Sequence, residues 1–93
     1  MLAPKLNLNG TSYNELMEKY AGAIERITEA AHAVQETCPH GRDFVGRETG
    51  FHIAMANHSA RLQKLNEIIE DLEKIRTDID DQYAESQRIK GKR

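Results

Sequence analysis

Tryptophan is absent from this sequence, and three tyrosines and two phenylalanines are its aromatic residues, so a deep aromatic pocket within one subunit is not expected. Cys38 is the single cysteine, which excludes an internal disulfide bond and is typical of a reducing compartment. No stretch approaches the roughly 20 apolar residues of a membrane span, and the N-terminus lacks the apolar run of a signal peptide. The formal net charge of −2 is unlike the strongly basic balance of general nucleic-acid-binding proteins. These absences favour a cytoplasmic protein without a membrane or nucleic-acid partner.

The length of 93 residues allows one domain with a modest core, and chains of this size often gain stability by forming oligomers. We divide the chain into a lead over residues 1–11, a helical domain over 12–89 and a basic tail over 90–93. The lead contains three leucines that either pack on a helix flank or stay loose: Leu2, Leu6 and Leu8.

The clearest pattern lies between Phe51 and Tyr83, a segment without proline or glycine. Its apolar residues recur at steps of mostly four and three, which places them on one stripe of an α-helix. The stripe consists of Phe51, Met55, His58, Leu62, Leu65, Ile69, Leu72, Ile75, Ile79 and Tyr83. We predict a helix over about 50–88 that begins near Glu48 or Thr49.

A second helix is predicted over about 12–38, with Ser12 and Glu15 at capping-box spacing and Pro39 ending it. Its stripe follows a heptad repeat: Tyr13, Met17, Tyr20, Ile24, Ile27, Ala31, Val34 and Cys38. Small or apolar neighbours widen the stripe at Leu16, Ala23 and Ala30. Gly22 costs about 1 kcal/mol in a helix interior relative to alanine, so we expect it to mark a close helix crossing.

These two segments predict an all-α fold, an antiparallel hairpin of two long helices with coiled-coil-like packing. The first helix spans roughly 37 Å and the second roughly 53–60 Å. Part of the second helix therefore stays uncovered, and we expect that part to carry Ile75, Ile79 and Tyr83 and to pack against another subunit of a homo-oligomer. A break near residues 78–81 is the alternative.

The connecting loop, predicted over residues 39–49, is the candidate ligand site. Its glycines and the start of the second helix would present backbone N–H groups to an anion. Arginines would grip phosphate or carboxylate, and phenylalanines would stack on a base. The candidate ligand-binding residues are Arg42, Arg47, Phe44, Phe51, His40 and Thr49, with Tyr13 as either a core residue or part of a pocket between subunits. The alternative is an ordinary connection, in which Asp43 caps a turn, Arg42 pairs with an acidic neighbour and the phenylalanines plug the hairpin end.

Metal binding and catalysis are not indicated by the remaining polar residues. Cys38 and His40 have no matching second pair, and His52 and His58 are six residues apart and do not share a helix face. His58 lies on the stripe, as expected of a packed polar residue or a register device. No general base beside a nucleophile is visible. We therefore expect no metal, no cofactor and no enzymatic activity.

An acidic stretch follows the middle of the second helix. It contains Glu67, Glu70, Asp71, Glu73, Asp78, Asp80 and Asp81, interrupted by Lys74 and Arg76. We interpret it as a solvated outer face. The alternative is a DNA-mimicking surface, or one that binds a basic partner.

Three segments resemble a group of small helical-hairpin proteins of phages and prophages: NGTSYNELMEKYAGAIERI, the loop Gly41-Arg42-Asp43-Phe44, and HSARLQKLNEIIEDLE. In that group the loop resembles Asn-Gly-Arg-Asp-Tyr-Tyr, and here His40 replaces the asparagine while Phe44-Val45 replaces the aromatic pair. The resemblance implies a phage-type protein in a bacterial host cell. By analogy of size and architecture with small phage proteins that sequester cyclic-nucleotide signals, we expect a non-enzymatic nucleotide-binding, anti-defence protein. A protein–protein module acting through a helix face is the alternative.

Overall fold

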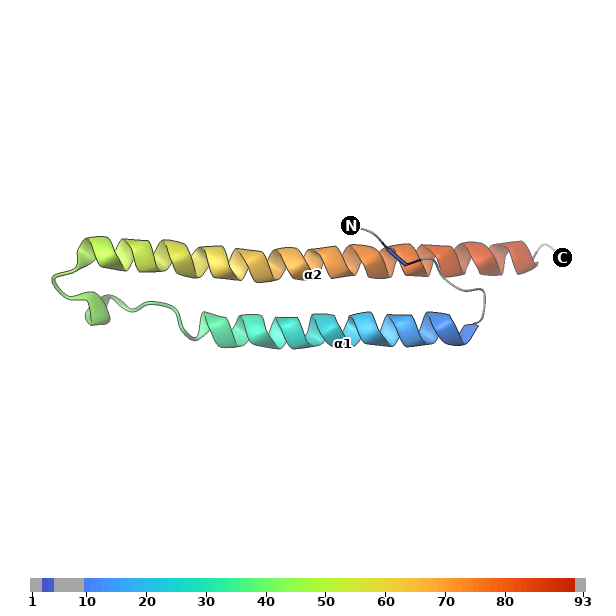
Figure 1. The fold of residues 1–93 in the computed structure, drawn as a ribbon, viewed down its shortest axis with the longest axis horizontal. Coiled ribbons are helices and arrows are strands. Elements are labelled where there is room, and N and C mark those ends of the chain that lie inside the picture. Colours follow the sequence, from blue (N-terminus) through green and yellow to red (C-terminus); the bar gives the residue numbers. More distant parts are fainter. Residues whose placement is uncertain (1–2, 5–9, 92–93) are drawn as a thin grey trace.

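Two long antiparallel helices form the fold in a computed structural model that describes residues 3–4 and 10–91 (Figure 1). Helix α1 spans Gly10–Gln35, a short 3-10 helix η1 spans Gly41–Phe44, and helix α2 spans Glu48–Gly91. The described ranges contain no strand, so the predicted all-α helical hairpin is confirmed. Neither long helix has an apolar stretch that would let it cross a membrane, within those same ranges. The leucines at positions 2, 6 and 8 lie outside the described residues.

The boundaries of α1 differ from the prediction at both ends. Helix α1 begins at Gly10, so Ser12 lies inside the first turn and the predicted cap at Ser12 is wrong. It ends at Gln35. The hydrogen bonds that follow span three residues instead of four; for example, the Thr37 N–H donates to the Val34 carbonyl at 2.9 Å. Pro39 disfavours helical backbone for the residue before it, and the chain has already left the helix. Cys38 is consequently exposed instead of completing the stripe.

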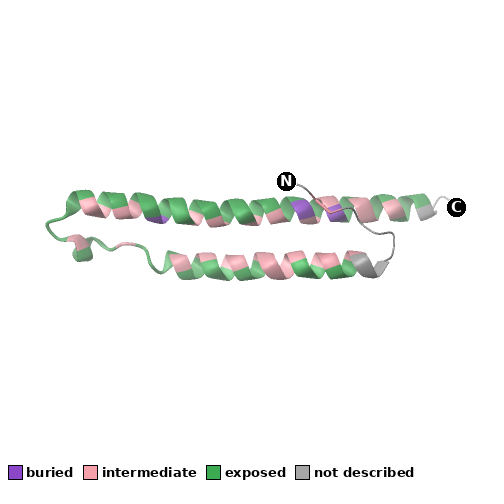
Figure 2. Ribbon diagram, in the orientation of Figure 1, coloured by how far each residue is buried: buried purple, intermediate pink, exposed green. Residues whose placement is uncertain are grey.

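Helix α2 runs unbroken for 44 residues, so the alternative of a break near residues 78–81 is wrong. It starts at Glu48, as expected, and continues to Gly91 inside the predicted tail. Every residue of the predicted α2 stripe is buried or half-buried, and the same holds for the α1 stripe apart from Cys38 (Figure 2). The heptad spacing therefore identified the facing sides of both helices.

The core lies at the end of the hairpin that holds the start of α1. Ile75 and Ile79 are buried there, and Tyr13 stacks on Tyr83 with ring centroids 3.9 Å apart. The partly buried residues around this pair of isoleucines are Ala3, Tyr13, Leu16, Met17, Tyr20, Leu72 and Tyr83. The expectation that Ile75, Ile79 and Tyr83 would be left uncovered is therefore wrong.

The path of the connection explains this error. After Gln35 the chain runs on beside the first turns of α2 before it reverses, so α1 lies against the later part of α2 (Figure 1). Helix α2 extends past the end of α1 near the loop, where η1 takes the place of a helical partner.

Gly22 does not mark a close helix crossing, contrary to the prediction. A Cβ atom at this position would have no neighbouring atom within 4 Å. The glycine lies on the outer side of α1, where its missing side chain leaves a shallow hollow.

Candidate functional site

The loop between the long helices is ordered around His40. The His40 ring caps η1, because its Nδ1 accepts the backbone N–H of Arg42 at 3.2 Å and the Arg42 Nε–H at 3.3 Å. The His40 carbonyl accepts the N–H of Asp43 at 3.0 Å. His40 thus performs the capping role that the ordinary-connection alternative gave to Asp43. Arg42 contacts this ring instead of the expected acidic neighbour.

The second half of the loop leads directly into α2. Gly46 has a φ of +77°, a conformation that favours glycine, and the Arg47 N–H donates to the Phe44 carbonyl at 2.8 Å. The Arg47 carbonyl accepts the first helical bond, from Phe51 N–H at 3.0 Å, so Arg47 occupies the N-cap position. An arginine side chain has no acceptor and cannot cap N–H groups. The first turn of α2 therefore keeps donors that suit an anion.

Phe44 and Phe51 close the loop against the start of α2. Their ring centroids lie 5.7 Å apart at 53°, and both rings are half-buried. Gly50 lies beside this pair, since a Cβ at Gly50 would be 3.8 Å from Phe44 Cδ1. This arrangement resembles the plug of the ordinary-connection alternative, with each ring offering only part of its surface for stacking on a base.

The structure groups six of the seven predicted ligand-binding residues at one end of the hairpin, and four of these side chains are exposed: His40, Arg42, Arg47 and Thr49. Tyr13 does not join them. It lies 22 positions before the end of α1, about 33 Å along the helix axis. Within one chain, Tyr13 therefore cannot share a ligand with the loop.

Tyr13 instead belongs to the core end of the hairpin. Its hydroxyl donates to Asp80 Oδ1 at 2.6 Å. This hydrogen bond, followed by desolvation and the negative charge of Asp80, raises the pKa of the Tyr13 phenol above its ordinary value. Core packing, one of the two roles predicted for Tyr13, is the one found within the chain.

The sequence analysis did not anticipate two buried polar groups without hydrogen-bond partners. His58 is 3% exposed, and neither of its ring nitrogens has a hydrogen-bond partner. The Nε atom of Arg76 is also buried without a partner, although Arg76 Nη1 lies 3.5 Å from Glu73 Oε2. The signal for His58 was its place in the α2 stripe, where it interrupts the apolar series; Arg76 lies outside that stripe, next to Ile75, and carried no such signal. Over residues 3–4 and 10–91, no three histidine, cysteine, aspartate or glutamate side chains gather closely enough to hold a metal ion.

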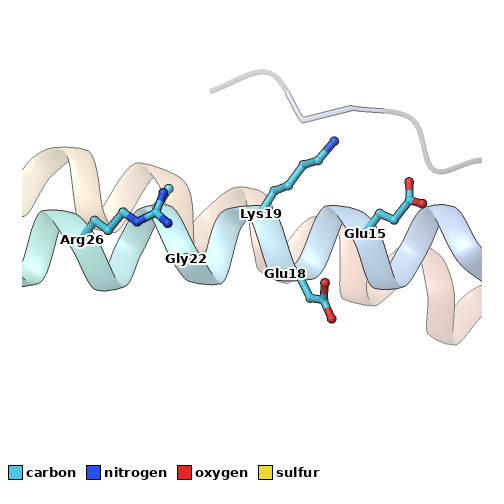
Figure 3. A pocket seen from close by; sticks show the side chains of 6 residues that line it. Glu15, Glu18, Lys19, Gly22 and Arg26 are labelled. Atoms are coloured by element: carbon cyan, nitrogen blue, oxygen red, sulfur yellow. The ribbon is translucent and has the colours of Figure 1, made fainter.

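Three shallow hollows lie along the hairpin, and loop residues line none of these three. The hollow of about 390 Å³ surrounds Gly22 on the outer side of α1, with charged side chains of both signs around it (Figure 3). A hollow of about 280 Å³ lies between the helices and is mostly apolar; its lining is Leu16, Lys19, Tyr20, Ala23 and Leu72. A polar hollow of about 180 Å³ is lined by Met17, Glu73, Arg76, Thr77 and Asp80. The widened α1 stripe was the sequence signal for the apolar hollow.

Comparison with known proteins adds no assignment to these features, since no family model, no curated protein and no solved structure matches this chain.

Proposed function

We propose that this chain is a non-enzymatic protein-interaction module that works as a homo-oligomer. The observation that carries the proposal is the surface left open by two helices. The chain exposes 7155 Å², against about 5,500 Å² for a compact monomer of this mass. Its radius of gyration is 20.2 Å, against about 12 Å for a compact domain of this length. Among the described residues, Ile75 and Ile79 are the buried hydrophobic side chains.

The outer surface of α2 supports a basic partner. Acidic side chains are exposed along it, including Glu67, Glu70, Asp71 and Asp81. Other acidic residues already serve the hairpin: Asp80 accepts from Tyr13, Asp78 from Gln82, and Glu73 pairs with Arg76. The exposed group, interrupted by Lys74, leaves a net negative strip that suits a basic protein surface, in the manner of an inhibitor, a scaffold or a DNA mimic.

Native mass spectrometry and affinity capture test the two parts of this proposal. We expect an oligomer in the mass spectrum and one stoichiometric basic protein captured from bacterial lysate. Reversing two α2 charges, Glu70→Lys with Asp81→Lys, should abolish capture. The same number of reversals on α1, Glu25→Lys with Glu29→Lys, should preserve it. A monomeric wild-type chain, or equal capture by both double variants, contradicts the proposal.

A second candidate function is sequestration of a phosphate-bearing nucleotide, such as a cyclic signal of antiphage defence, in keeping with the resemblance to phage-type hairpin proteins. The specific observation in its favour is that the exposed Arg47 occupies the N-cap position of α2, and the exposed Arg42 lies in η1 of the same loop. This candidate site consists of loop residues alone, because Tyr13 lies at the other end of the hairpin.

Isothermal titration against cyclic di- and trinucleotides tests this second candidate. We expect one nucleotide to bind, and Arg47→Ala to weaken binding by at least about tenfold, or 1.4 kcal/mol, because one charge-assisted phosphate contact is lost. The control is Arg61→Ala, which removes an exposed arginine of α2 outside the loop. Silence across the panel by folded wild-type protein contradicts this candidate.

A further inference from the structure

The two sides of the hairpin differ in chemistry. In heptad letters the stripe residues occupy positions a and d, with a at Met17, Ile24 and Ile69, for example, except Ile75, which falls at g. Positions g and e flank the stripe, and in an antiparallel pair the g positions of both helices border one side while the e positions border the other. The g positions are Leu16, Ala23 and Ala30 on α1 and Ala54, Arg61, Ile68, Ile75, Gln82 and Ile89 on α2. The e positions are Asn14, Ala21, Thr28 and Gln35 on α1 and His52, Ser59, Asn66, Glu73, Asp80 and Gln87 on α2.

The g side, called the g face below, is therefore largely apolar, whereas the e side is largely polar. The two hollows between the helices agree with this assignment. The apolar one is lined by Leu16 and Ala23 from g positions, and the polar one by Glu73 and Asp80 from e positions.

The two described residues of the lead, Ala3 and Pro4, lie against one end of the g face. Ala3 packs against the core isoleucines, and Gln82 Nε2 donates to the Pro4 carbonyl at 3.1 Å. Ile75 is buried at this end. One heptad closer to the loop, the next g residue of α2, Ile68, is 47% exposed. The middle of the g face is thus open to solvent.

The pattern of apolar residues at a, d and g is typical of helices in the core of a bundle, whereas a two-helix coiled coil needs only a and d. The excess surface agrees in size. If each chain hides its excess of about 1,700 Å², two chains bury about 3,400 Å² in total, within the range of obligate homodimers. We propose that a second copy of this chain packs on the g face and completes a four-helix bundle. This inference rests on the self-association in the proposed function and names its surface.

Charges at the edge of the g face select the arrangement of the two copies. Next to the g positions, at heptad position c, α1 carries Lys19 and Arg26, whereas three of the four c positions of α2 from residue 64 onward are acidic: Asp71, Asp78 and Glu85, with Lys64 as the fourth. Stacking α1 of one copy over α2 of the other places basic against acidic edges, and it brings both loops to the same end. The opposite arrangement stacks α1 on α1 and places like charges together.

Thiol alkylation tests the buried surface with minimal disturbance of the fold. Two variants are made in a Cys38→Ser background, each with one thiol. Ile68→Cys places the thiol on the g face, and Asn66→Cys places it on the e side, two residues away on α2. We expect alkylation at position 68 to be at least about tenfold slower than at 66, and to speed up on dilution as copies separate. Equal rates at both positions that do not depend on concentration overturn the inference.

A charge at the same two positions gives an independent measurement. Ile68→Lys should raise the dissociation constant of the assembly at least about tenfold because it buries an unpaired charge, and Asn66→Lys should leave it within about twofold. Helicity by circular dichroism reports whether each variant folds. If both variants associate like wild type, the g face is wrong while self-association stands. A monomeric wild type removes the proposed function as well.

Spin labels on the native Cys38 test the arrangement. With both loops at one end, the two labels lie about a bundle width apart, roughly 20–30 Å. Opposite ends separate them by tens of ångströms more along the axis, and such a distance overturns the same-end arrangement.

Discussion

Residues in the stripe differ widely in how well their side chains are satisfied. Ile79 is fully buried, and the stacked rings of Tyr13 and Tyr83 close the core end. His58, by contrast, is buried with two unpaired ring nitrogens. A buried polar group without a partner loses its hydrogen bonds to water and gains none in return.

Replacement of His58 by leucine should therefore stabilise the protein. We expect His58→Leu to raise the free energy of unfolding by about 1–3 kcal/mol, because leucine suits a d position and removes the unpaired nitrogens. Urea unfolding at fixed protein concentration measures this change. His52→Leu, at an exposed position of the same helix, should stay within about 0.5 kcal/mol of wild type. A loss of stability in His58→Leu would mean that the imidazole makes a contact in the assembly.

Tyr13 gives the core end a dependence on alkaline pH. The hydrogen bond to Asp80 raises the pKa of Tyr13 above its ordinary value of 10.0, so the fold favours the protonated phenol. Its stabilising contribution is complete below pH 10.0 and is lost as the pH rises through the raised pKa. Unfolding measured over this range should show a decline that is absent in Tyr13→Phe, which keeps the ring stack. An identical decline in both proteins would exclude Tyr13 as its source.

At the scale of elements, the heptad repeat determines which side of each helix faces the other, but local chemistry places the ends. Helix α1 stops at Gln35 although its stripe continues to Cys38, because the approach of Pro39 is incompatible with helical backbone. Helix α2 starts without a capping side chain because Arg47 occupies its N-cap. In the loop, the His40 side chain caps η1. The loop sequence alone could not distinguish this role from capping by Asp43.

Two glycines should respond oppositely to alanine. Gly22→Ala should stabilise the protein by about 1 kcal/mol, because the position is helical and a Cβ there meets open space. Gly46→Ala should destabilise it by about 1–2 kcal/mol, because φ is +77° and a Cβ is strained in that region. Denaturant unfolding of the two variants compares them directly. A destabilised Gly22→Ala protein would indicate a partner chain packed closely on that side of α1.

At the scale of the whole molecule, the hairpin is a rod with principal extents of 73 × 18 × 16 Å. A rod of two helices encloses only a small core, so most stripe residues among those described remain half-buried (Figure 2). The self-association proposed here rests on the same physics as the pairing of α1 with α2: apolar area is removed from water.

Solution scattering distinguishes lateral from end-to-end assembly. Two rods side by side, with axes about 10 Å apart, should have a radius of gyration near 21 Å, close to the 20.2 Å of one hairpin. Two rods joined end to end should give roughly 40 Å from the same extents. Small-angle X-ray scattering on samples of known mass separates the two cases, and the larger value contradicts lateral packing on the g face.

The periodicity of the sequence was sufficient to determine two long helices, their antiparallel pairing and the residues that face each other, because a stripe with steps of three and four can be buried only on a helix. It did not determine the offset between the helices. A heptad stripe repeats every seven residues, so α1 can pair with α2 at several offsets using similar contacts. The path of residues 36–47 beside α2 and the stacking of Tyr13 on Tyr83 select one of them. That selection places the core at Ile75 and Ile79 and separates Tyr13 from the loop, because long-range contacts, unlike periodicity, exist only once the chain has folded.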